Sequence, residues 1–252
     1  MKRTLILMYG LVSYGLFFVT FLYAIGFVGN LWVPRSIDSE PTLSLGMALL
    51  VNFGLLAIFA VQHSGMARPA FKRWLTRYIP EAAERSTYVL LSSVAMALMM
   101  YYWAPLGGGI WAVDSHWAGL TLNALYLGSW VLLLYATFLI NHFDLFGLRQ
   151  VWLAFRKQEK HELKFVTPAL YNIIRHPIYV GWLGIAWFTP VMTVTHILFA
   201  LGVTGYILVG IKLEERDLQQ AHPEYSQYMR KVPALIPSFS RHLNTPAETS
   251  AA

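Results

Sequence analysis

Long apolar stretches without a charged residue dominate the chain, and short charged segments separate them. Five stretches of this kind are present, namely 4–34, 41–67, 86–113, 115–143 and 176–211. A transmembrane helix needs about 20 predominantly apolar residues, so each of the first four stretches predicts one span. The expected cores of these spans are residues 5–28, 43–61, 88–103 and 120–140.

The fifth stretch is too long to be one span. As a single helix its roughly 36 residues would measure about 54 Å, against a hydrocarbon core of about 30 Å. Thr189-Pro190 lies near its middle, and proline removes a backbone donor and disfavours helix at the residue before it. We therefore expect a hairpin of 178–188 and 195–211, giving six segments, or five if the short first arm does not cross.

The composition agrees with a membrane protein. Hydrophobic residues make up 56% of the chain and charged residues only 13%, whereas soluble domains carry about 25% charged residues. We expect an all-α, polytopic helical bundle that forms one domain over residues 1–241, with a disordered tail at 242–252. The chain has no cysteine, and its histidines are not spaced with acids as metal ligands, so no metal site is predicted.

Lys and Arg residues fall almost entirely on one side of the predicted membrane. If the spans alternate in direction, 18 of the 19 basic residues share the side of both chain ends, and Arg35 falls on the other. The positive-inside rule then places both termini and the long basic loops in the cytoplasm. This asymmetry, together with anionic lipid, accounts for the net charge of +6. We thus expect contact with membrane lipid and none with nucleic acid.

The opposite side is expected to be almost featureless. Its loops, 29–41 and 106–118, are short, and Gly107-Gly108-Gly109 predicts a flexible corner. The apolar run after Lys2-Arg3 is too long for a signal peptide and has no small-residue cleavage site. It is therefore interpreted as a retained first helix, and the chemistry is expected in the cytoplasmic half.

Polar clusters end the second and fourth spans. His63 and Arg68 follow the second span, and His142, Asp144 and Arg149 follow the fourth. Ionisable groups near membrane depth usually face an interior or a cavity. The alternatives are an ordinary helix end at the interface for His63 and an amphipathic re-entry helix after the fourth span.

Two further clusters bracket the hairpin. Arg175-His176-Pro177-x-Tyr179-x-Gly181 precedes it, and Glu214-Glu215 follows it. Tyr225 and Tyr228 then predict an amphipathic helix, which leads into an extended strap that ends near residue 237. Membrane topology alone does not explain two adjacent acids on the side where basic residues gather, so at least one of them is a candidate for binding a ligand. The alternative is that Glu215 simply pairs with Arg175 or Arg216.

As a set, these last 65 or so residues resemble the isoprenylcysteine carboxyl methyltransferase superfamily of integral membrane methyltransferases. The resemblance implies a helical bundle whose cytosolic face cups S-adenosylmethionine, with 175–237 as the cofactor-binding hairpin and strap. It assigns contact with this cofactor to one group of residues. They are Arg175, His176, Pro177, Tyr179, Gly181, Glu214, Glu215, Tyr225 and Tyr228.

Three upstream motifs narrow the resemblance. Gln62-His63-Ser64-x-Met66-Ala67-Arg68-Pro69, Glu84-Arg85-Ser86-Thr87-Tyr88 and the run from His142 to Gln150 look like those of the bacterial methanethiol S-methyltransferases. NnrU-type membrane proteins share parts of the same pattern. This second resemblance implies methylation of a small volatile thiol, methanethiol, to dimethyl sulfide in a bacterial cytoplasmic membrane, with S-adenosylhomocysteine as the other product.

Methyl transfer to sulfur needs a thiolate, because the thiolate is the nucleophile. His142 and His63 are candidate bases, Asp144 is a candidate for orienting such a histidine, and Arg68 or Arg149 is a candidate for stabilising the thiolate. Aromatic residues such as Tyr88 either line a pocket or pack between helices. Two other functions stay open, a methyltransferase for a lipid or prenylated carboxylate, and a membrane transporter or sensor.

Overall fold

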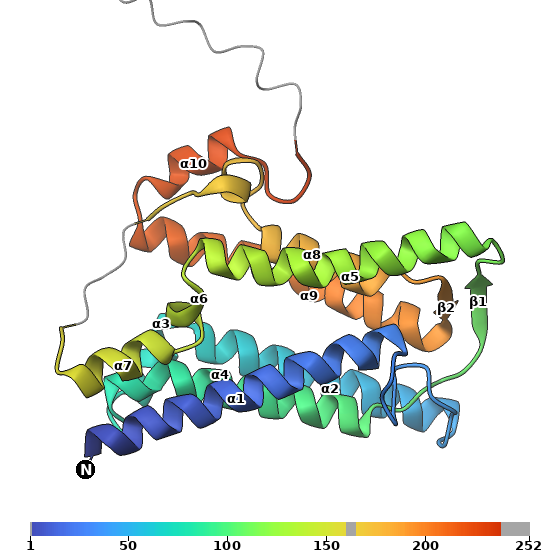
Figure 1. Ribbon diagram of the computed structural model, residues 1–252, viewed down its shortest axis with the longest axis horizontal. Helices are drawn as coiled ribbons and strands as arrows, with labels where there is room; N and C mark the ends of the chain where they lie inside the picture. Colours follow the sequence, from blue (N-terminus) through green and yellow to red (C-terminus); the bar gives the residue numbers. More distant parts are fainter. Residues whose placement is uncertain (1, 160–164, 238–252) are drawn as a thin grey trace, which may run out of the picture.

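The computed structural model describes residues 2–159 and 165–237 and shows two layers of long helices (Figure 1). One layer contains α1 (Lys2–Gly29), α2 (Leu45–Ala67) and α4 (Glu81–Tyr102), with α4 packed against the other two. The second contains α5 (His116–Leu139), α8 (Pro177–Trp187) and α9 (Val194–Ala221), with α8 packed against both neighbours. The predicted all-α polytopic bundle is confirmed.

Four of the predicted spans coincide with long apolar helices, and the predicted span 88–103 lies almost entirely in α4, which is a long helix but is not among those apolar enough to cross a membrane. Within the described residues, α1, α2, α5 and α9 are long and apolar enough to cross a membrane, and α8 is a shorter apolar helix. Large apolar side chains such as Leu50, Val61 and Val131 are exposed on these helices, as expected for surfaces that face lipid. The predicted turn at Thr189-Pro190 is also present, because α8 ends at Trp187 and α9 begins at Val194.

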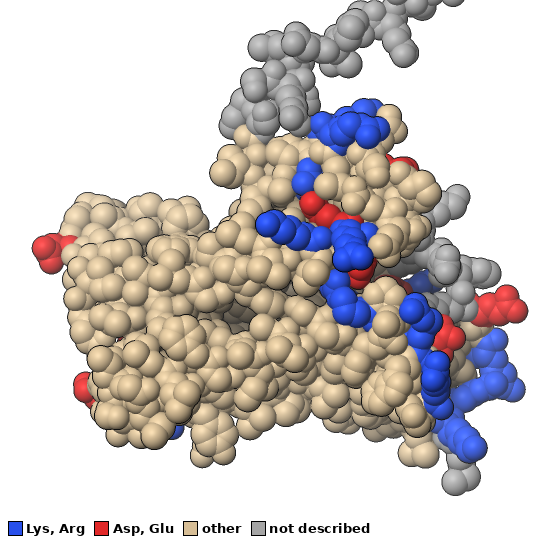
Figure 2. Space-filling model, turned by 180° about the vertical axis from the view of Figure 1, so that it is seen from behind, with Lys and Arg blue, Asp and Glu red and all other residues tan. Residues whose placement is uncertain are grey.

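Short elements gather at the two ends of the bundle. At the end that we call the basic end lie α3 (Pro69–Leu75), α6 (His142–Leu145), α7 (Leu148–Arg156), the 3₁₀ helix η1 (Ala169–Asn172) and α10 (Tyr225–Lys231). Figure 2 shows the Lys and Arg side chains concentrated there. The other end, which we call the sheet end, carries β1 (Gly109–Ala112) and β2 (Val191–Thr193). The predicted tail 242–252, together with Lys160, His161, Lys164 and Arg241, lies outside the described residues.

The two layers share an apolar core near the sheet end. Phe27, Trp103, Trp130, Ile185 and Phe199, which come from both layers, are each at most 3% exposed and belong to one cluster. A smaller apolar cluster lies toward the basic end, around the buried residues of α2 and α4. Apolar packing therefore joins the layers at the sheet end more extensively than at the basic end.

The expectation that the outer loops are featureless is wrong. β1 pairs with β2 in an antiparallel two-stranded sheet, so Gly109 belongs to a strand rather than to a flexible corner. Gly107 and Gly108 both have φ of +69°, a left-handed conformation that glycine adopts at little cost. The sheet links the segment after α4 to the segment before α9, and thus connects the two layers.

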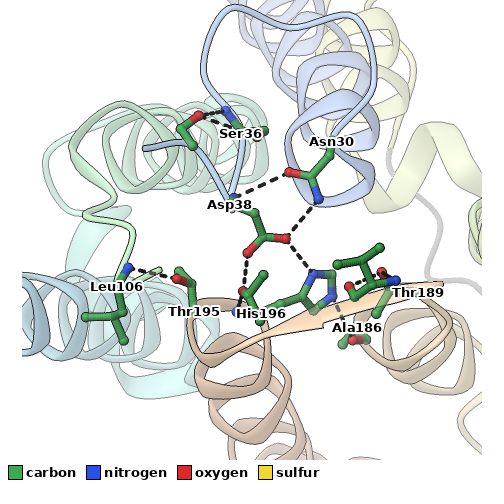
Figure 3. Close-up of polar contacts among 11 residues, drawn as sticks. Asn30, Ser36, Asp38, Leu106, Ala186, Thr189, Thr195 and His196 are labelled. Atoms are coloured by element: carbon green, nitrogen blue, oxygen red, sulfur yellow. Dashed lines mark hydrogen bonds and ion pairs between the residues drawn. The ribbon is translucent and has the colours of Figure 1, made fainter. Parts of the chain in front are cut away.

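A carboxylate fastens the remaining loop at this end (Figure 3). Asp38 accepts hydrogen bonds from Asn30, at 2.9 Å, and from Thr193, and it lies 3.5 Å from Nδ1 of the buried His196. Burial raises the pKa of the Asp38 carboxyl, but the neighbouring His196 and hydrogen bonds from Thr193 and Asn30 outweigh this and hold the pKa below its ordinary value. The loop after α1 is thereby tied to the start of α9.

Glycine allows α5 and α8 to approach closely. A Cβ atom at Gly184 would lie 2.1 Å from Oγ and 2.9 Å from Cβ of Ser129, and one at Gly181 would lie 2.9 Å from Cβ of Leu133. Gly181 therefore has a packing role on this face, and its assignment to cofactor contact stays a prediction. Close packing of small residues is a common way to join helices in a membrane.

We expect Gly184→Ala to destabilise the protein by about 1–3 kcal/mol, because the added methyl group overpacks the α5–α8 contact. Gly128→Ala is the matched control, since Gly128 lies on α5 and a Cβ there would meet nothing within 4 Å. Thermal unfolding in detergent measures both. Equal midpoints for the two variants would contradict this account of the contact.

Candidate active site

The entry into α8 is held by backbone pairing with the end of the described chain. Pro177 occupies the first turn of α8, where its missing N–H is not needed. The backbone N–H groups of Arg175 and His176 donate to the carbonyl oxygens of Pro233 and Ala234, at 2.9 and 3.1 Å. Residues 232–237, which we call the strap, therefore lie beside the start of the helix.

One buried carboxylate connects the elements around this point. Oε1 of Glu215 accepts from Nε and Nη2 of Arg175, at 2.8 and 2.7 Å, and lies 2.9 Å from Nε2 of His176. Arg175 also donates to the carbonyl oxygens of Met229 and Val232. The arginine and glutamate side chains are only 10% and 12% exposed. Glu215 thus pairs with Arg175, the alternative raised above, and joins α8 and α9 to α10 and the strap.

The neighbouring acid, Glu214, is placed differently. Its side chain is 45% exposed, and its Oε2 accepts from Oη of Tyr179 at 2.7 Å. The Tyr179 ring stacks on His176 with ring centroids 5.3 Å apart. A carboxylate that is held in place and still open, beside an aromatic face, suits a ligand that carries positive charge. Of the two adjacent acids, Glu214 is therefore the one available to a ligand.

Tyr225 and Tyr228 anchor α10. Tyr225 is 2% exposed, its ring contacts that of Tyr228, and Tyr228 donates its hydroxyl to the Tyr171 carbonyl oxygen. Burial raises the pKa of Tyr228 to about 12, so this hydroxyl stays protonated over the physiological range. The geometry gives both residues a role in placing α10, and cofactor contact by either stays a prediction.

A second polar wall faces this region from α2 and α4. Nε2 of His63 lies 2.9 Å from the Tyr88 hydroxyl, and Nδ1 lies 3.2 Å from the Ser92 hydroxyl. The His63 ring lies 6.4 Å from the ring of Tyr206 on α9, centroid to centroid, and Arg68 donates to the carbonyl oxygen of Leu213, the residue before Glu214. The structure therefore brings His63 and Glu214 to the same site, although 150 residues separate them in the sequence.

Polar contacts hold this wall to α9. Oγ of Ser64 lies 3.0 Å from Oη of Tyr206. Arg68 pairs with Asp217 at 2.9 Å and donates to the Leu213 carbonyl oxygen at 3.2 Å. The surface seen in Figure 2 is hollowed where α2 and α9 face each other. Arg68 thus fastens the end of α2 to the end of α9, beside the candidate site.

His142 lies in a different environment from His63. The Thr137 hydroxyl donates to the Leu134 carbonyl oxygen, at 2.7 Å, and so accepts from Nδ1 of His142 at 2.8 Å. Nε2 of His142 then accepts from the Tyr14 hydroxyl, also at 2.8 Å. Both nitrogens of a neutral imidazole are satisfied in this way, and the ring stacks on Phe138.

Asp144 does not contact His142 and so does not orient it. Its carboxylate pairs with Arg149 at 2.9 Å, and its backbone N–H donates to Asn141 at the start of α6. The hydrogen bonds described for His142 go to Tyr14 and Thr137, and the proposed role of Arg149 in stabilising a thiolate stays a prediction. Asp144 and Arg149 thus pair with each other, apart from His142, although all three lie within eight positions of the sequence.

Sequence reasoning did not single out Ser92, Tyr206 or Asp217 as site residues. Ser92 follows Tyr88 by four positions on α4, so both lie on one helix face. This spacing, together with polarity inside an apolar run, is a signal that identifies Ser92. Tyr206 and Asp217 join the site through contacts with α2, which the order of the chain does not reveal.

The fold and site define a polytopic helical membrane protein with a site lined by histidine, tyrosine and carboxylate at the basic end. The NnrU protein family model matches residues 51–239. Methanethiol S-methyltransferase from Crocosphaera subtropica is 52% identical, covering 94% of this chain and 93% of its own length. The enzyme of the same name from Mycobacterium tuberculosis is 49% identical, covering 96% and 100%.

Nurim from Bos taurus is more distant, at 30% identity over 70% of each chain. No solved structure matches. The chain therefore belongs to the NnrU family, and it is about 50% identical over almost its whole length to proteins named methanethiol S-methyltransferase. The resemblance drawn from the sequence motifs is thereby confirmed.

We expect the stability of the protein to fall as the pH drops below about 6.5 because of His142. Burial lowers the pKa of His142 from its ordinary value of 6.5, so the unfolded chain binds a proton that the folded chain does not. Stability then rises with pH in this window, by at most about 1.4 kcal/mol per pH unit. Thermal midpoints measured from pH 7.5 to 5 report this slope.

His142→Gln should reduce the slope by the share that this residue contributes, and His116→Gln, at an exposed position, should leave it unchanged. A slope that persists in full in the His142 variant would assign the proton uptake to another group.

Proposed function

We propose that the protein methylates a small thiol, methanethiol, with S-adenosylmethionine as the donor, and yields dimethyl sulfide and S-adenosylhomocysteine. The names of relatives at about 50% identity support this proposal. The observation that carries it in the structure is the contrast between two adjacent acids. Glu215 is committed to Arg175 and His176, whereas Glu214 is held by Tyr179 and stays open.

The chemistry of the residues around Glu214 fits the proposed donor. S-adenosylmethionine supplies a methyl group on a positively charged sulfur that is already a good leaving group. Glu214 would hold positive charge or hydroxyl groups of this cofactor, and the stacked rings of Tyr179 and His176 would form a flat wall for its base. Arg175 and Glu215 would support this wall from behind through the contacts that place His176.

The acceptor would bind on the opposite side, against α2 and α4. A small apolar thiol partitions into lipid and needs no water-filled channel to reach a site between helices. The chain would align the thiol with the methyl group and exclude water, since much of the barrier can be removed by orientation. The His63 wall, rather than His142, is our choice for thiol activation. The His63 ring lies beside Tyr206 of α9, the helix that carries Glu214, whereas His142 contacts residues of α1 and α5.

We further propose that the basic end faces the cytoplasm of a bacterium. The Lys and Arg side chains gather at that end (Figure 2), and Arg35 lies in the loop at the sheet end. The positive-inside rule favours this orientation, which also places the site where a soluble cofactor is made. Both termini and the site would then share the cytoplasmic side.

Substitutions of the two adjacent acids should have different effects, one on cofactor binding and the other on the stability of the fold. We expect Glu214→Gln to weaken binding of S-adenosylhomocysteine or S-adenosylmethionine by about tenfold or more, with little change in thermal midpoint. Glu215→Gln should instead destabilise the fold by several kcal/mol, because it leaves the buried Arg175 without its partner charge. Calorimetric titration and thermal unfolding in detergent measure the two effects. Unchanged affinity in the Glu214 variant would remove this residue from the proposed cofactor site.

The reaction itself is tested by supplying purified protein in lipid nanodiscs with methanethiol and methyl-labelled S-adenosylmethionine. Labelled dimethyl sulfide in the headspace is the expected product, in amounts equal to the S-adenosylhomocysteine formed. Labelled methyl ester in a lipid extract, without dimethyl sulfide, would point to a lipid carboxylate as acceptor. Protein that binds neither the cofactor nor its product would refute the proposed donor.

A further inference from the structure

We propose that the acceptor thiol binds beside Gly210 of α9, in a space that the ring of Tyr206 closes at one end. The proposal rests on the function proposed above, because it assigns the acceptor side of the same site and limits the acceptor to a short alkyl thiol. It is carried by the spacing of residues along α9 and by the space that the glycine leaves.

Three residues of α9 share one face because they follow one another at intervals of four. Tyr206, Gly210 and Glu214 occupy successive turns, about 6 Å apart along the helix axis. Oη of Tyr206 lies 3.0 Å from Oγ of Ser64 on α2, so this face is turned toward α2. Gly210 therefore lies between the tyrosine that meets α2 and the acid that stays open.

Gly210 leaves space on this face that the described residues do not fill. A Cβ atom there would have one atom from another element within 4 Å, namely Oη of Tyr179 at 3.6 Å, an ordinary contact distance. The side chains of Tyr206 and Glu214 lie beyond 4 Å from that point. No close packing requires glycine here, in contrast to Gly184, and the space is available to a ligand.

Contacts between α2 and α9 close this space toward the sheet end. A Cβ atom at Gly202 would lie 3.0 Å from Cδ1 of Leu56, so the leucine fills the gap one turn before Tyr206. The Tyr206 ring then meets two rings of α2, with centroid distances of 6.2 Å to Phe59 and 6.4 Å to His63. These three rings separate the space beside the glycine from the apolar core.

Toward the basic end the space borders the proposed donor region. Glu214 is 45% exposed and accepts from Oη of Tyr179 at 2.7 Å. The same Oη borders the space beside Gly210, so one hydroxyl lies between the two proposed ligands. Arg68 bridges the helices farther along, through Asp217, and Figure 2 shows the surface hollowed where α2 and α9 face each other.

The dimensions of the space favour a short acceptor. About 6 Å along the helix axis separates Gly210 from Tyr206, and non-bonded carbon atoms keep about 3.5–4.0 Å apart. A methyl group fits against the ring of Tyr206, with its sulfur toward Glu214, whereas a longer alkyl chain meets the ring. The same limit disfavours a lipid or prenylated acceptor.

Gly210→Ala tests the position of the acceptor. It should lower kcat/KM for methanethiol by about tenfold or more, because the added methyl group occupies the space. Affinity for S-adenosylhomocysteine should be unchanged and the thermal midpoint no lower, since alanine is the better helix former. Gly205→Ala is the matched control, because Gly205 is an exposed glycine of the same helix whose Cβ would meet nothing within 4 Å.

Tyr206→Ala tests the limit on length. It should raise kcat/KM for 1-butanethiol relative to methanethiol by about tenfold or more, because the chain can then extend past the missing ring. Tyr206→Phe should keep the wild-type ratio, since it removes only the hydroxyl contact with Ser64.

A further measurement does not depend on activity. The chain has no cysteine, so Gly210→Cys introduces a single thiol into the space. It should react about tenfold more slowly with benzyl methanethiosulfonate than with methyl methanethiosulfonate, because the larger group meets Tyr206. Tyr206→Ala in the same chain should remove the difference. Intact-protein mass spectrometry measures both rates.

Four results would overturn the proposal. Unchanged kcat/KM in Gly210→Ala would show that the acceptor does not bind beside this residue, and weaker S-adenosylhomocysteine binding there would assign the space to the donor. An unchanged acceptor ratio in Tyr206→Ala would remove the ring as the limit on length. Labelling of Gly210→Cys without size dependence, in a chain whose wild type is active, would refute the space itself. A wild-type protein that makes no dimethyl sulfide would instead refute the proposed function.

Discussion

The buried carboxylate of Glu215 is the interaction on which the candidate site depends. An unpaired charge at this position would cost several kcal/mol, and the structure satisfies it with Arg175 and His176 from the entry of α8. Because Arg175 also binds carbonyl oxygens of α10 and the strap, one ion pair fixes four elements. The next residue on α9, Glu214, is rotated by about 100° around the helix and so stays open beside Tyr179. The position of the exposed Glu214 thus follows from the burial of Glu215, the adjacent residue in the helix.

Apolar contacts join the two layers near the sheet end, whereas polar contacts join α2 to α9 toward the basic end. The layers share a close-packed core near the sheet end, and loops there are tied by the strand pair and by Asp38. Toward the basic end, α2 meets α9 through Ser64, Tyr206 and the pair of Arg68 with Asp217. Polar contacts at a membrane boundary exchange with water at modest net cost. The molecule is therefore most firmly joined away from its site and least firmly joined at it.

The spans and the central turn were accessible from the sequence because hydropathy and proline act locally. The two-stranded sheet was not, because three or four residues beside glycines show no periodicity, and the pairing joins segments about 80 positions apart. His63 and His142 read alike in the sequence, since each ends a span. Their environments differ because His63 contacts Tyr88 and Ser92, whereas His142 contacts Tyr14 and Thr137. These partners depend on how the helices pack, which the sequence pattern does not show.

Because the strand pair joins the two layers at the sheet end, a tilt of a helix moves mainly its opposite end, where the candidate site lies. A helix of 28 residues, such as α1 or α9, is about 42 Å long. Because the layers are joined at the sheet end, a tilt of about 5° in such a helix moves its far end by about 3.7 Å. That displacement is close to the contact distance between two carbon atoms. Small differences in helix tilt therefore change the spacing between helices more at the basic end than at the sheet end.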